Sequence, residues 1–133
     1  MLNAEFPSAV AAGNVETSTR IVDVVLGALA QAIPEIIPAA SHGSMNNIAM
    51  GSTGSEKHAA WDYYETIGGG MGASAISDGQ DGVQTHQTNT LNTLIALFEM
   101  NYPCRVHRSH IRRAPGGPGA HLGGDWLSRA CEI

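Results

Sequence analysis

Residues 68–82 contain six glycines, three of them consecutive at Gly68, Gly69 and Gly70. Glycine adopts backbone conformations that other residues avoid, and its missing side chain lets another segment approach closely. A long segment without regular structure in a compact domain is usually a functional loop or is disordered. The cluster therefore predicts a glycine-rich loop that either belongs to an active site or allows tight internal packing, and this alternative also covers Gly72.

The hydrophobic pattern on either side of this loop predicts an α+β fold. Apolar residues cover most of the circumference of an expected helix at residues 17–33, which Pro34 ends, so we expect a buried helix. A second helix is expected at residues 92–101 and ends before Pro103. Strands are expected at residues 45–50, 59–67 and 83–87, and in a C-terminal β-hairpin at residues 104–113 and 125–133. We therefore predict one unit with a mixed sheet, a buried helix, glycine-rich loops and a C-terminal β-hairpin.

The charge of the chain limits the class of partner. A net charge of −5 argues against general nucleic-acid binding, which depends on Lys and Arg neutralising phosphates. One basic run lies between Arg105 and Arg113 in the expected hairpin. We interpret this run as a solvated strand face or a subunit contact, with binding of an anionic substrate as the alternative.

Three features predict a cytoplasmic protein without a membrane partner. The longest apolar run, at residues 21–33, is too short to span a bilayer. The first twelve residues lack the basic region of a signal peptide. Cys104 and Cys131 are too few for a disulfide framework, and we expect both to be reduced thiols.

The chain shows no complete metal, nucleotide or nucleophile motif. Its six histidines lack the short paired spacings of zinc sites. Residues 68–73 fit G-x-G-x-x-A, but no helix is expected after them, so the context of a dinucleotide loop is missing. Ser41 and His42 are adjacent, yet neighbours in sequence rarely form a catalytic triad, and no orienting acid stands beside them.

Five short motifs occur in order along the chain. They are GNVETS at residues 13–18, SMNN at 44–47, YYETIGGGMG at 63–72, THQTNT at 85–90, and GGPG at 116–119 with GGD at 123–125. Together they resemble the B subunit of the hydantoinase/5-oxoprolinase family, and the similarity extends from Asn3 to Glu132.

These motifs contain the candidate site residues. His86 lies in a motif where hydroxyl, amide and imidazole groups converge, so it is a candidate proton donor, with Thr88 and Asn89 as substrate-binding residues. The alternative is that these groups satisfy one another's hydrogen bonds. Glu65 ends a strand just before the glycine loop, where it is a candidate catalytic carboxylate or a member of an ion pair. Asn46, Gly68, Gly69 and Gly70 complete the candidate substrate-binding set.

The resemblance implies part of an ATP-dependent enzyme that opens hydantoin or 5-oxoproline rings. It implies a hetero-oligomer in which an A-type subunit binds ATP and the small cyclic amide is the substrate. Family B subunits are several times longer, so the 133 residues are expected to be a C-terminal fragment, with the divalent-metal motifs in the N-terminal part. A fragment of an acetone or acetophenone carboxylase, or a non-catalytic assembly module, are the alternatives.

Overall fold

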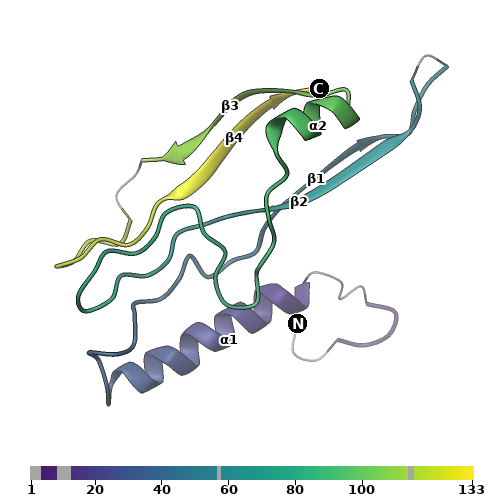
Figure 1. The fold of residues 1–133 in the computed structure, drawn as a ribbon. Coiled ribbons are helices and arrows are strands. Elements are labelled where there is room, and N and C mark those ends of the chain that lie inside the picture. Colours follow the sequence, from purple (N-terminus) through teal and green to yellow (C-terminus); the bar gives the residue numbers. More distant parts are fainter. Residues whose placement is uncertain (1–3, 9–12, 57, 114–115) are drawn as a thin grey trace.

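The computed structural model describes residues 4–8, 13–56, 58–113 and 116–133, and it confirms the α+β class. Figure 1 shows helix α1 along one side of the molecule and two β-hairpins on the other, with the short helix α2 between the hairpins. The elements are α1 (Gly13–Ala30), β1 (Asn46–Ser52), β2 (Trp61–Ile67), α2 (Ile95–Asn101), β3 (Arg105–Arg112) and β4 (Trp126–Glu132).

The strands form two separate antiparallel hairpins, so the prediction of one mixed sheet is wrong. β1 pairs only with β2, and β3 only with β4, among the described residues. The strand expected at residues 83–87 is reduced to one isolated bridge between Val83 and Gly69. Gly82 and His86 have positive φ values of 62° and 53°, which an extended strand does not allow, and they flank this bridge closely.

A small aromatic core joins the two hairpins to α2. Phe98 of α2 is 1% exposed, and its ring centroid lies 4.7 Å from that of Tyr63 on β2. Tyr102 stands 5.0 Å from Tyr63 in a second edge-to-face contact, a favoured geometry for aromatic pairs. Cys104 is buried beside them, and burial raises the pKa of its thiol, so it stays protonated as predicted for a reduced cysteine.

Helix α1 is not buried within the described residues, so the prediction of a buried helix is wrong. Its apolar side faces outward, with Val24 71% and Val25 53% exposed. Its polar side faces the body of the molecule instead, where Glu16 accepts a hydrogen bond from the backbone N–H of Met45 at 3.0 Å. The helix ends at Ala30, before the expected Ile33, and turns follow it to Pro34. The proline ring disfavours helical geometry in the residue before it.

The glycine-rich segment after β2 lies between two other segments and is held to both by backbone hydrogen bonds. On one side, the amide of His42 donates to the carbonyl of Gly70 at 3.1 Å. On the other side, the amide of Gly124 donates to the carbonyl of Met71 at 2.9 Å. The segment therefore connects residues near His42 with the chain that enters β4.

Close backbone packing explains the consecutive glycines. A Cβ atom on Gly70 would overlap the carbonyl oxygen of Gly124, and one on Gly69 would overlap the ring of His42. At Gly68 the added atom would lie 2.6 Å from the carbonyl oxygen of Gly82. The sequence left two explanations open for these glycines, an active-site loop or tight internal packing. Tight internal packing accounts for all three.

Candidate functional site

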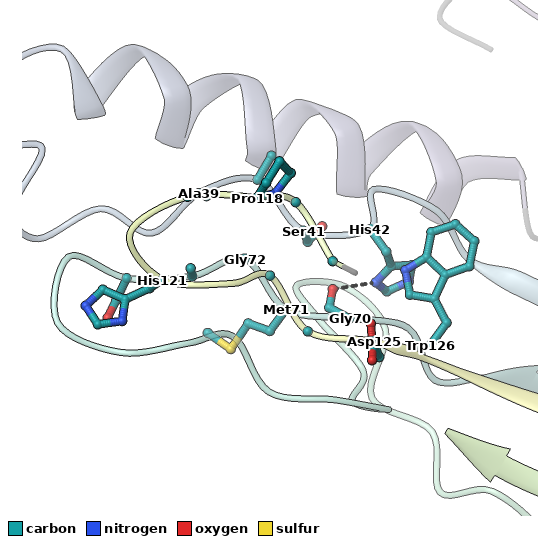
Figure 2. Close-up of a pocket in the computed structure, with 18 of the residues that line it drawn as sticks. Ala39, Ser41, His42, Gly70, Met71, Gly72, Pro118, His121, Asp125 and Trp126 are labelled. Carbon is teal, nitrogen blue, oxygen red and sulfur yellow. Dashed lines mark hydrogen bonds between the residues drawn. The ribbon is translucent and has the colours of Figure 1, made fainter. Parts of the chain in front are cut away.

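A cleft of about 810 Å³ lies between the glycine-rich loops. Three segments surround it: residues 39–42, residues 70–75 and residues 116–126, with Arg112 at the end of β3. Figure 2 shows His42 and Trp126 at one end of this cleft and His121 at the other. Its lining is formed largely by small residues, so peptide groups are close to any ligand in it.

His42 is oriented by the backbone of the glycine loop. Its Nδ1 atom lies 3.2 Å from the carbonyl oxygen of Gly70 (Figure 2). A carbonyl only accepts hydrogen bonds, so Nδ1 must carry the proton, and Nε2 of the neutral ring is left as an acceptor. Within the described part of the chain Nε2 has no hydrogen-bond partner. The geometry therefore presents an oriented imidazole that can accept and return a proton.

Ser41 lines the cleft beside His42, but it is not an activated nucleophile. Its hydroxyl donates to Oδ2 of Asp23 at 2.9 Å and accepts from the amide of Gly43 at 3.0 Å. The acid that sequence reasoning did not find is thus Asp23 on α1, and it binds the serine directly. The order required for a serine triad, with histidine between serine and acid, is absent from this group of residues.

His86 is not among the residues that line the cleft. Its Nε2 atom is 2.8 Å from Oδ1 of Asp23, the carboxylate that also binds Ser41. The backbone of His86 has a positive φ of 53°, which is uncommon for a residue other than glycine. His86 therefore connects the loop after Val83 to α1, and through Asp23 it reaches the segment that lines the cleft.

The same contacts lower the pKa of Asp23. Burial by itself raises the pKa of this carboxyl group, but the hydrogen bonds from His86 and from the amide and hydroxyl of Ser41 outweigh it. The pKa is therefore below the ordinary value of 3.8. At neutral pH the carboxylate is ionised and holds α1, Ser41 and His86 together.

Acid is expected to weaken this connection. A carboxyl group whose pKa is depressed by folding contributes stability above its unfolded pKa and loses it as the pH falls through the folded value. Urea unfolding of the wild-type chain and of Asp23→Asn, at about pH 5 and about pH 3, should show a smaller difference in unfolding free energy at the lower pH. A difference that is equal at both pH values would mean that the charge of Asp23 does not stabilise the fold.

Glu65 is buried between the hairpins and does not line the cleft. Its Oε2 atom forms an ion pair with Arg129 of β4 at 2.5 Å. Its Oε1 atom accepts hydrogen bonds from the amide of Thr93 at 2.6 Å and from Asn92 at 3.1 Å. Of the two possibilities raised by the sequence, the structure places Glu65 in a core ion pair.

The other predicted site residues have local partners or face solvent. The hydroxyl of Thr88 accepts from the amide of Thr85 at 3.0 Å and donates to the carbonyl of the same residue, which closes the turn at His86. Asn89 is exposed, and Asn46 pairs with Ile67 at the start of β1. Of the predicted catalytic and substrate-binding residues, only Gly70 lines the cleft, together with Gly72 of the predicted glycine-rich loop.

Sequence reasoning did not select the side chains that line the cleft, among them His42, Arg112 and Trp126. Arg112 belongs to the basic run, whose alternative interpretation was anion binding. Trp126 follows the GGD motif directly, so the motif marked the region without identifying the side chain. His42 was set aside for lack of an acid, and only the fold shows that the carbonyl of Gly70 orients it.

The described residues were also compared with the requirements of a metal site and of a membrane-spanning helix. No group of three or more His, Cys, Asp or Glu side chains in this part of the chain is arranged to hold a metal ion. None of the described helices combines the length and apolar character needed to cross a membrane.

Comparison with known families identifies the chain. All of residues 1–133 match Hydantoinase B/oxoprolinase. The chain belongs to this family. It is 46% identical to 5-oxoprolinase 1 of Arabidopsis thaliana over 126 residues and 40% identical to 5-oxoprolinase of Dictyostelium discoideum over 133 residues. An uncharacterized protein of Methanocaldococcus jannaschii is 47% identical over 133 residues.

The family members matched are much longer than this chain. The aligned region is 95% of the chain but 9% of the Arabidopsis protein, and 100% of the chain but 10% of the Dictyostelium protein. It is 23% of the Methanocaldococcus protein. The chain therefore corresponds to a part of its relatives, as expected from the sequence. No solved structure matches it.

Proposed function

We propose that the chain is part of an ATP-dependent enzyme that hydrolyses cyclic amides such as hydantoins or 5-oxoproline. The observation that carries this proposal is the family match along all 133 residues, together with the two 5-oxoprolinases at 46% and 40% identity. In this proposal an A-type subunit or region uses ATP to activate the ring, and the B-type part completes ring opening. In this proposal the divalent metal is bound outside these 133 residues, in the rest of a full-length family member. The described residues contain no group of three or more His, Cys, Asp or Glu side chains that could hold it.

The cleft supports this proposal because its groups suit an amide ring. Ring opening adds water to the carbonyl carbon and breaks the carbon–nitrogen bond, so the water loses a proton and the ring nitrogen gains one. His42 can perform both transfers, because Gly70 holds its Nδ1–H and leaves Nε2 as a base. His86 and Glu65 then act as positioning residues: His86 through Asp23 and Ser41, and Glu65 by joining the hairpins through Arg129.

A chimera tests the proposed function. This chain replaces the matching segment of Arabidopsis 5-oxoprolinase 1, and ATP-dependent hydrolysis of 5-oxoproline is measured. The chimera should be active, whereas the isolated 133-residue chain should show no turnover with ATP and divalent metal. Because His42 transfers protons, His42→Ala should reduce the rate of the chimera by about 10² to 10⁴.

His58, an exposed residue between β1 and β2, provides the matched control. His58→Ala should leave the rate of the chimera unchanged. A folded chimera in which His42→Ala turns over as fast as His58→Ala would remove His42 from the mechanism. A folded chimera without any turnover would contradict the proposed function itself.

A further inference from the structure

We infer that the cleft recognises a carboxylate on the cyclic amide and that Arg112 is the specificity-determining residue that binds it. The inference rests on the proposed function and deepens it, because hydantoins and 5-oxoproline differ in this group: the first has no carboxylate and the second has one. It concerns the choice between substrates rather than the ring-opening step.

The first observation is the position of an unpaired cation at the cleft. Arg112 lines the cleft from the end of β3, and no carboxylate of the described residues lies within ion-pair distance of it. Two other basic side chains already have carboxylate partners: Arg129 pairs with Glu65, and Nδ1 of His121 lies 3.3 Å from Oδ1 of Asp78. A guanidinium presents a planar set of donors that matches a carboxylate, so Arg112 is available to bind one from a ligand.

The second observation is an aromatic surface beside this cation. Trp126 is directly opposite Arg112 in the β3–β4 register, and half of its surface is exposed. Figure 2 shows its indole next to His42 at one end of the cleft. A flat five-membered ring can lie against the indole, which offers a large apolar face at little cost in side-chain entropy.

The third observation is the charge of the other polar side chains that line the cleft. The Asp125 side chain also lines the cleft, and its carboxylate is an acceptor for a ring N–H. A carboxylate on the ligand is repelled by Asp125 and attracted by Arg112. The charges therefore orient a carboxylate-bearing lactam with its acid toward Arg112 and its N–H toward Asp125.

Binding of matched ligands to the 133-residue chain tests the inference. The probes are 5-oxoproline and 2-pyrrolidinone, which is the same ring without the carboxylate, and binding is followed by tryptophan fluorescence and by NMR titration. 5-Oxoproline should bind at least about tenfold more tightly, since a hydrogen bond between charged groups is worth that factor or more. Arg112→Gln should remove the difference between the ligands, and Arg112→Lys should restore part of it.

Arg108→Gln is the control, because Arg108 is an exposed arginine of the same strand that does not line the cleft. It should leave the preference unchanged. Equal binding of both ligands by the wild-type chain, or an equal effect of Arg108→Gln and Arg112→Gln, would overturn the role of Arg112. In that case an active chimera would still support cyclic-amide hydrolysis, so the two proposals fail separately.

Discussion

Replacing Glu65 with glutamine is expected to lower the free energy of unfolding by about 3–5 kcal/mol, a large part of the roughly 5–15 kcal/mol of a typical domain. Glu65 is buried, and the side chain of its partner Arg129 is only 13% exposed. Glutamine keeps an oxygen for the amide of Thr93 but removes the negative charge. The guanidinium is then left in the interior without compensation, and this dominates the cost.

Two further variants separate the charge effect from a general effect of substitution. Glu132 forms an exposed ion pair with His107, and Glu132→Gln should change the unfolding free energy by less than about 1 kcal/mol. Combining Glu65→Gln with Arg129→Met removes both charges and should recover part of the loss. Urea unfolding measures all three. If Glu65→Gln is as mild as Glu132→Gln, the buried ion pair does not hold the hairpins together.

Replacing Gly70 with alanine should cost more than about 3 kcal/mol, at or above the upper end of overpacking effects. The new Cβ would overlap the carbonyl oxygen of Gly124, a backbone atom that cannot move without separating the two segments. The same change should disorder the cleft, because Gly70 also binds both the amide and the ring of His42. Urea unfolding and the NMR signals of the cleft residues measure the two effects.

Gly27 gives the matched control for this substitution. It lies inside α1, and a Cβ added there meets no atom within 4 Å. Gly27→Ala should therefore stabilise the chain by about 0.5–1 kcal/mol, the usual gain when alanine replaces glycine in a helix. If the two alanine variants have similar stability, the close approach of residues 70 and 124 is not a requirement of the fold.

Much of the local structure follows from neighbouring residues and could be predicted. Strand β2, expected at residues 59–67 and found at Trp61–Ile67, alternates in burial from Trp61 to Glu65. Helix α2 ends at Asn101, just before Pro103, because proline cannot continue a helix. The hairpin of β3 and β4 lies within a residue or two of its predicted bounds. In each case the signal is carried by residues that are close in sequence.

The location of the cleft could not be predicted in the same way. His86 and Glu65 stood out because reactive groups beside glycine-rich motifs often serve catalysis, but the same groups can support a fold. Their partners, Asp23 and Arg129, are 63 and 64 residues away in the chain. Nothing local to either residue indicates that such a partner exists.

The α+β class, most element positions, the family and a glycine-rich loop after residue 67 could be read from the sequence. These follow from local periodicity, from proline and glycine stereochemistry and from motifs that can be read in order. The tertiary structure alone decided that the strands form two hairpins, that the polar side of α1 faces inward, and that His42, Arg112 and Trp126 share a cleft. The physical reason is that burial and ion pairing depend on which distant segments meet, and that pairing is a property of the whole folded chain.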